Sequence, residues 1–147
     1  MAKTYAQNRK ASFDYQLLDE FEAGIVLSGH ETKAVKAGKM TLTGAFVIVR
    51  GGEAYLLGAE IAPYQAQNLP EGYEVDRTRK LLLRKKEIKK LEREKEEKGL
   101  TILPVSVYNK RDLVKVRVAL AKRKKKGDKR ETIKKRETDR KIRRYTR

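Results

Sequence analysis

The sequence contains no cysteine, no tryptophan, one histidine and three prolines among its 147 residues. Without cysteine, disulfide bonds and thiolate metal sites are excluded. No apolar run approaches the roughly 18 residues of a membrane span, and residues 1–5 hold no apolar segment typical of a secretory signal. We therefore expect a cytoplasmic protein without a membrane partner.

Acidic residues are scarce relative to basic ones, with 20 Asp or Glu against 37 Lys or Arg and a net charge of +17. Residues 122–147 hold 15 basic and 4 acidic side chains, which is +11 of that +17. They contain too little apolar surface to offset their ordering entropy. We expect a core over residues 1–121 and a basic tail over residues 122–147, disordered alone and ordered by nucleic-acid phosphates. A solvated tail and a nuclear-localisation stretch are the alternatives.

The core has mostly the two-residue periodicity of strands. Residues 15–27 alternate between apolar and polar side chains and predict one long strand, bent near Ala23 and Gly24. Further strands are predicted over residues 45–49, 54–57, 101–108 and 114–120. The first two of these form a hairpin about Gly51 and Gly52.

Two helices are expected between the strands. Ser28 and Glu31 have the spacing of a capping box, and Gly38 is placed to end the helix that they begin. Asp76 is expected to cap a second helix, over residues 77–98, which Gly99 ends. Its apolar stripe is Leu81, Ile88 and Leu91. The pattern is mainly β with helices and favours an antiparallel barrel of the OB type with flanking helices, although periodicity alone leaves the topology open.

Candidate catalytic groups are few. His30 lies beside the capping serine and is expected to be an exposed residue of the cap rather than a general base. The sequence has no glycine-rich phosphate loop and no nucleophile elbow. We interpret Glu20, Glu22 and Glu31 as ion-pair and capping residues, and expect no catalytic residue, no metal and no cofactor. An RNA nuclease that uses this acidic cluster is the alternative from the class of enzymes.

Four segments in order carry a resemblance to a known family. They are Asn8-Arg9-Lys10-Ala11, Glu22-Ala23-Gly24 followed by Gly29-His30-Glu31-Thr32-Lys33, Arg79-Lys80-Leu81-Leu82-Leu83, and Asp128-Lys129-Arg130. Over residues 8–130 the chain closely resembles the SmpB family, whose members bind tmRNA in bacterial trans-translation. The resemblance implies an OB-type core that binds the tRNA-like domain of tmRNA. It also implies a tail that becomes helical in the empty mRNA channel of the ribosome. We expect a monomer with these two partners.

Site residues follow from the resemblance and from the basic side chains around the matched positions. The expected RNA-binding residues are Asn8, Arg9, Lys10, Glu22, Glu31, Lys33, Lys36, Arg79, Lys80, Leu82 and Arg84. The expected ribosome-binding residues of the tail are Lys122, Lys124, Lys125, Asp128, Lys129, Arg130, Lys134 and Lys135. Three positions depart from the family pattern: Arg84 replaces an amide or imidazole, Arg123 a glycine, and Gly127 an aromatic ring that some relatives carry. We therefore expect a phosphate contact at Arg84, a stiffer hinge into the tail at Arg123 and no stacking contact at Gly127.

Several alternatives stay open. Glu22 either accepts hydrogen bonds from base amino groups, orients a neighbouring arginine, or forms an ordinary ion pair on a strand. Glu31 either contacts RNA or caps its helix. Leu82 lies off the predicted apolar stripe and packs either on a splayed base or in the core. The alternative function is a basic ribosome-associated or ribosomal protein with no tmRNA role.

Overall fold

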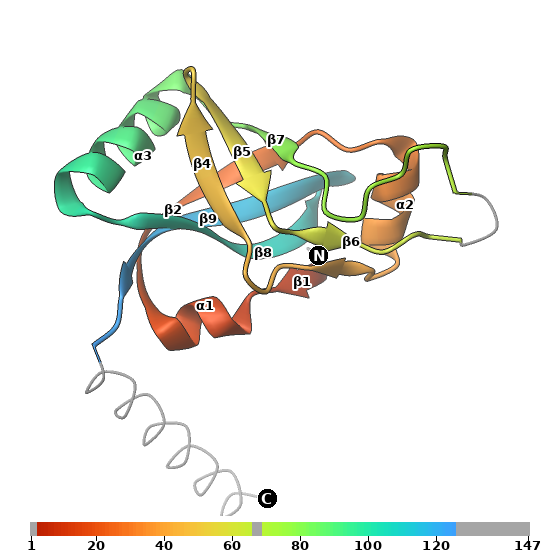
Figure 1. Ribbon diagram of the computed structural model, residues 1–147, viewed down its shortest axis with the longest axis horizontal. Coiled ribbons are helices and arrows are strands. Elements are labelled where there is room, and N and C mark those ends of the chain that lie inside the picture. Colours follow the sequence, from red (N-terminus) through yellow and green to blue (C-terminus); the bar gives the residue numbers. More distant parts are fainter. Residues whose placement is uncertain (1–2, 66–68, 126–147) are drawn as a thin grey trace, which may run out of the picture.

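The computed structural model describes residues 3–65 and 69–125 (Figure 1). In chain order the elements are β1 (Thr4–Gln7), α1 (Arg9–Asp14), β2 (Tyr15–Ile25), α2 (Gly29–Lys36), β3 (Met40–Thr41), β4 (Phe46–Arg50), β5 (Glu53–Leu57), β6 (Glu60–Ile61), β7 (Arg79–Leu82), α3 (Lys85–Lys98), β8 (Thr101–Lys110) and β9 (Leu113–Arg123).

The main sheet closes into a ring of antiparallel strands. Its order is β1-β8-β4-β5-β7-β2-β9, and β9 also pairs with β8, so the sheet curls back on itself. Strand β4 joins β8 at Val47 and Ile102, both almost completely buried. Helices α2 and α3 lie at opposite ends of the barrel, and α1 packs on β2 and β8 (Figure 1). The predicted mainly β fold, an antiparallel barrel with flanking helices, is confirmed.

Strand β2 follows the predicted alternation and ends at Ile25, two residues earlier than expected. Its ladder with β9 is irregular between Leu17 and Glu20, so the irregularity does not fall at Gly24, where the bend was predicted. Gly24 instead pairs with Leu82 of β7. A Cβ atom at Gly24 would lie 3.3 Å from the Cβ of Leu82, so glycine permits a close approach of the two strands here.

The capping box of α2 is confirmed. The Glu31 backbone N–H donates to Ser28 Oγ at 3.1 Å, and the Ser28 backbone N–H donates to Glu31 Oε1 at 2.9 Å. The helix ends at Lys36, and Gly38 then adopts a φ of +79°, which is the left-handed conformation expected after a helix end. The predicted β4–β5 hairpin is also confirmed: Gly51 and Gly52 both have positive φ, as a tight hairpin turn requires.

The helix predicted over residues 77–98 is wrong in its first turns. Helix α3 begins at Lys85, and Arg79–Leu82 form strand β7 between β2 and β5. Leu81 faces the core while Leu82 faces outward, which is a strand alternation within an apolar run. Pairing with two distant strands outweighs the local helical pattern here. The predicted stop at Gly99 is confirmed by its left-handed conformation.

Several short elements in the first half of the chain were missed. Residues 9–14 form α1, and β1, β3 and β6 have two to four residues each. Such strands are defined by partners that are distant in sequence: β1 pairs with β8, and β3 pairs with β6. Their own sequences are too short to carry a periodic signal.

The predicted boundary between core and tail lies too early in the chain. Strand β9 continues to Arg123, which pairs with Tyr15, and Ala121 is 1% exposed. The backbone N–H of Lys124 then donates to the carbonyl oxygen of Asp14 at 2.9 Å. Lys122, which was expected in the tail, is therefore part of the barrel. The predicted tail beyond Lys125 lies outside the described residues.

Candidate nucleic-acid interface

Glu22 and Leu82 lie on the outer face of the barrel. Gly24 pairs with Leu82 across β2 and β7, and Glu22 follows the same face of β2 two residues away. The side chain of Leu82 is 53% exposed, an unusual position for a leucine. Of the two alternatives left open by the sequence, packing in the core is therefore wrong for Leu82. Its exposed side chain can contact a partner.

The carboxylate of Glu22 is held by two side chains of β8. Tyr108 Oη donates to Glu22 Oε2 at 2.5 Å, and Lys110 Nζ donates to Oε1 at 3.0 Å. Arg117 of β9 stacks its guanidinium 5.3 Å from the centre of the Tyr108 ring. The hydrogen bond from Tyr108, followed by that from Lys110, lowers the pKa of Glu22. The ion pair that the sequence offered as one alternative is therefore present in the isolated chain.

Two other basic residues of this surface are also paired with acids. Lys80 lies 2.5 Å from Glu53, and Arg117 lies 3.8 Å from Glu20. Together with the pair of Lys110 and Glu22, these contacts offset part of the positive charge of the face. The outward residues of β7, β2, β9 and β8 around Glu22 and Leu82 form one surface. We call it the mixed face. Its chemistry suits base edges and shape more than a continuous row of phosphates.

Arg79 and Glu31 do not lie on the surface, contrary to prediction. Arg79 is 0% exposed and Glu31 is 2% exposed. Arg79 Nε donates to Glu31 Oε2 at 2.8 Å, and the guanidinium also donates to the carbonyl oxygens of Ala59, Arg77 and Val75. The cluster joins α2 to β7 and to the chain that precedes β7. Any part these two residues have in binding is therefore indirect.

The pKa of Glu31 reflects this cluster. Burial alone raises it, but hydrogen bonds from Arg77, the Ser28 backbone and Arg79 outweigh burial and lower the pKa of Glu31 to about 2. Glu31 thus stays ionised inside the protein. The capping alternative for Glu31 is confirmed, with a second role as the partner of two arginines.

Asn8 is a further predicted site residue that proves to be buried, at 6% exposure. Its side-chain oxygen accepts from the backbone N–H of Ala11 at 3.2 Å, and its amide nitrogen donates to the carbonyl oxygen of Pro104 at 2.9 Å. Asn8 thereby caps α1 and ties it to β8. The Asn8 side chain is therefore not on the surface, whereas the side chains of its neighbours Arg9 and Lys10 are exposed.

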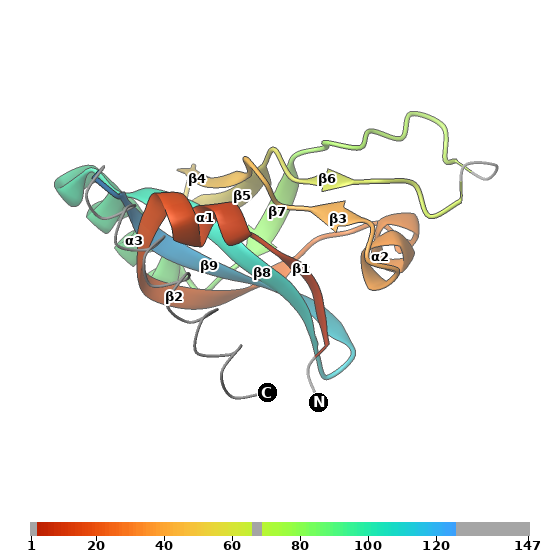
Figure 2. The ribbon, with the colours of Figure 1, turned by 90° about the horizontal axis from the view of Figure 1, so that it is seen from below.

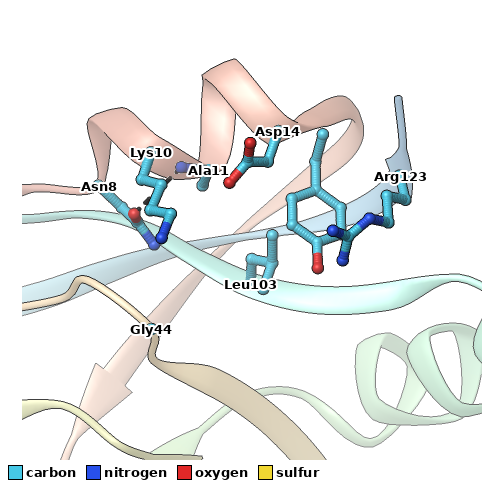
Figure 3. A pocket seen from close by; sticks show the side chains of 8 residues that line it. Asn8, Lys10, Ala11, Asp14, Gly44, Leu103 and Arg123 are labelled. Atoms are coloured by element: carbon cyan, nitrogen blue, oxygen red, sulfur yellow. Dashed lines mark hydrogen bonds between the residues drawn. The ribbon is translucent and has the colours of Figure 1, made fainter. Parts of the chain in front are cut away.

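A pocket of about 250 Å³ lies between α1 and the end of β9 (Figure 3). Lys10 of α1 and Arg123 of β9 line it, with Asp14 and Tyr15 between them. Near this pocket, Lys124 Nζ donates to the carbonyl oxygen of Ser12 at 3.2 Å. The structure thus brings Lys10 and the start of the predicted tail together, although they are more than a hundred residues apart in sequence.

The remaining predicted cations are exposed but separated. Lys33 and Lys36 lie on α2, and Arg84 lies at the start of α3, at the other end of the barrel. None of these three has an ion-pair partner within residues 3–65 and 69–125. Of the tail residues, Lys122, Lys124 and Lys125 are described, whereas Asp128, Lys129, Arg130, Lys134 and Lys135 lie outside the described residues.

Sequence reasoning missed Tyr108 and Lys110 as partners of Glu22. The alternation of Lys115 and Arg117 with valines marked a basic outer face on β9, but nothing local indicated which acid it meets. Tyr108 reaches Glu22 across the intervening strand β9, so the contact depends on strand order. That order was the feature that periodicity left open.

His30 has a structural contact. Its Nε2 accepts from the backbone N–H of Tyr64 at 3.1 Å, and its ring lies edge-on to Tyr73 at 5.1 Å. Over the described part of the chain, no three His, Asp or Glu side chains gather closely enough to hold a metal ion. In the same residues, no helix is long and apolar enough to cross a membrane.

Within the described residues, a small antiparallel barrel with exposed, unpaired cations around a face of mixed charge is typical of a nucleic-acid-binding protein. Comparison with known proteins gives the family. The family described as SmpB protein matches residues 5–147, and the chain belongs to the SmpB family.

Relatives are similar along almost the whole chain. The SsrA-binding protein of Coprothermobacter proteolyticus (strain ATCC 35245 / DSM 5265 / OCM 4 / BT) is 50% identical over 143 residues, which cover 97% of this chain and 95% of the relative. The SsrA-binding protein of Streptococcus mutans serotype c is 49% identical over 95% of this chain and 89% of the relative. A solved chain described under "tmRNA-SmpB: a journey to the center of the bacterial ribosome" is 41% identical, with a TM-score of 0.67. The match covers 86% of this chain and 92% of that chain.

Proposed function

We propose that this protein binds tmRNA and acts with it on the bacterial ribosome in trans-translation. Membership of the SmpB family over residues 5–147 carries this proposal. It is supported by relatives described as SsrA-binding proteins and by the similar chain from a tmRNA–SmpB ribosome structure. The protein acts by binding and delivery, and the cytoplasm, where ribosomes translate, is the expected location.

The barrel binds the tRNA-like domain of tmRNA through the mixed face. The exposed side chain of Leu82 and the carboxylate of Glu22 supply contacts to bases, and exposed cations such as Arg9, Lys33 and Arg84 neutralise nearby phosphates. The buried residues Asn8, Glu31 and Arg79 hold these elements in place. A folded RNA is recognised by shape and by exposed bases, which suits a face that is not uniformly basic.

The basic C-terminal residues bind the ribosome in its empty mRNA channel. Their net charge of +11 over residues 122–147 favours an RNA-lined environment. The chain leaves the barrel after Arg123, beside Lys10 and the pocket of α1, so the tail begins next to an exposed cation of the core.

The test is to purify the full-length protein from its host after crosslinking and to sequence the bound RNA. The proposed function predicts strong enrichment of tmRNA together with ribosomal RNA. Enrichment of ribosomal RNA alone, unchanged in a strain that lacks tmRNA, would instead identify a ribosome-associated protein without a tmRNA role.

A further inference from the structure

Two residues of β8 hold Glu22 in different ways. Tyr108 is 7% exposed, and its ring lies across β9 beneath the guanidinium of Arg117. Lys110 lies near the β8–β9 turn, which Figure 2 places beside the start of β1, and its side chain is 51% exposed. Both bonds end on the same carboxylate, at Oε2 and Oε1 respectively.

The two contacts therefore differ in how far their surroundings restrict them. The Tyr108 hydroxyl is carried by a ring that is only 7% exposed, so its neighbours restrict its movement. Lys110 has a flexible stem in water, and exposed ion pairs of this kind contribute little to stability. Lys110 can therefore leave Glu22 at small cost, whereas Tyr108 stays.

We infer that Tyr108 is a positioning residue that fixes Glu22 for RNA recognition, and that Lys110 is an exchangeable counter-ion. When RNA binds, Lys110 moves from Glu22 Oε1 to a phosphate, and Oε1 accepts an N–H from an unpaired base. The inference rests on the proposed function, in which the mixed face binds RNA, and it adds a role for two residues that the sequence did not single out.

The chemistry of the site selects a base edge as the ligand of Glu22. An ionised carboxylate only accepts hydrogen bonds and is repelled by phosphate. Amino and imino groups of unpaired bases offer N–H donors, and the exposed Leu82 side chain on the neighbouring strand offers an apolar surface for a base. Lys110 neutralises Glu22 in the free protein and so keeps the face from repelling an approaching RNA.

The experiment measures the affinity of the full-length protein for the tRNA-like domain of tmRNA over a range of KCl concentrations. The variants are Tyr108→Phe, Lys110→Met and Glu22→Ala, with the double variant of Tyr108→Phe and Glu22→Ala. Tyr5→Phe and Lys98→Met are the controls. Tyr5 has no hydroxyl bond to the described residues, and Lys98 forms an exposed pair with Glu94 on α3.

Each variant has a separate expected result. Tyr108→Phe weakens binding about five- to tenfold without changing the salt slope, because it misplaces one charge-assisted hydrogen bond and touches no phosphate. It has no further effect when Glu22 is already alanine. Lys110→Met lowers the slope of log affinity against log salt by about 0.7 to 0.9, the loss of one phosphate contact. Both controls bind as the unaltered chain does.

If the affinity losses from Tyr108→Phe and Glu22→Ala were additive, the positioning role would be overturned. A tyrosine that acts independently of Glu22, through the fold or through its own contact with RNA, would weaken binding further even when Glu22 is already alanine. An unchanged salt slope in Lys110→Met would overturn the exchange. The lysine result does not depend on how well Tyr108→Phe folds, because Lys110 is exposed. Failure of the unaltered chain to bind this RNA would refute the proposed function itself, a distinct outcome.

Discussion

Arg79 and Glu31 form an ion pair in the interior of the protein, with Arg79 Nε 2.8 Å from Glu31 Oε2. The pair joins the first turn of α2 to strand β7, and each partner makes further hydrogen bonds that satisfy its remaining polar atoms. A charge buried in this way is costly if its partner is lost. The cluster thus secures the elements that carry Lys33 and Leu82.

The first prediction concerns the stability of this cluster. Arg79→Ala leaves the Glu31 carboxylate uncompensated in the interior and should lower the free energy of unfolding by about 3 to 5 kcal/mol. The adjacent residue Lys80 is exposed in a surface pair with Glu53, so Lys80→Ala should change stability little. Urea unfolding followed by circular dichroism measures both variants. Equal, small effects would show that the buried pair does not secure the fold.

The second prediction concerns acid stability. Glu31 has a folded-state pKa of about 2 against an ordinary value of 4.5. Its contribution, on the order of 3 kcal/mol, is therefore complete above pH 4.5 and is lost as the pH falls from 4.5 towards 2. Glu31→Gln should be less stable at neutral pH and should lose less on acidification. Unfolding free energies at several pH values measure this, and parallel pH profiles for the two proteins would contradict it.

The third prediction concerns the specificity of the mixed face. Glu22→Ala should weaken binding of the tRNA-like domain about tenfold although it makes the protein more positive, because a specific hydrogen-bond acceptor is lost. Glu20→Ala removes the same charge from the same strand and should leave affinity equal or tighter, since Glu20 lies 3.8 Å from its partner Arg117. Titration with labelled RNA measures both. Tighter binding by both variants would indicate a purely electrostatic interface.

The fourth prediction separates the barrel from the C-terminal residues. A chain that ends at Lys125 retains all of β9 and the Lys124 bond to Asp14, and it should keep its fold. It should bind tmRNA with a shallower salt dependence, because many basic residues are removed. It should not support peptide tagging on stalled ribosomes.

The control for this truncation is the full-length chain with alanine at Asp128, Lys129 and Arg130. It should bind tmRNA almost normally and should also fail to tag. Normal tagging by the truncated chain, or complete loss of its tmRNA binding, would contradict the proposed division between barrel and tail.

Some elements of this protein were predictable because their causes are local. The Ser28–Glu31 capping box, the glycines of the β4–β5 turn and the stop at Gly99 depend on neighbours within a few residues. The strand alternation of β2 and β9 follows from a buried and an exposed face on each strand. The basic character of the C-terminal residues is a matter of composition alone.

The site was only partly predictable. The family resemblance pointed to Glu22 and Leu82, which the structure places near one another on the outer face of the barrel, but the sequence could not distinguish an exposed Arg79 from a buried one. An arginine beside lysines has the composition of a binding surface whichever way it points. Pairing of Arg79–Leu82 with β2 and β5 turned the Arg79 side chain inward, where Glu31 compensates its charge.

The sequence by itself determined the family, the strand-rich core, the local caps and turns, and the charge that marks RNA as a partner. The tertiary structure decided that residues 79–82 form a strand, that Asn8, Glu31 and Arg79 support the surface from within, and that Tyr108 reaches Glu22 across β9. The physical reason is the distance along the sequence over which each effect acts. Caps, turns and composition act over a few residues, whereas burial and side-chain partners depend on which distant strands pair when the barrel closes.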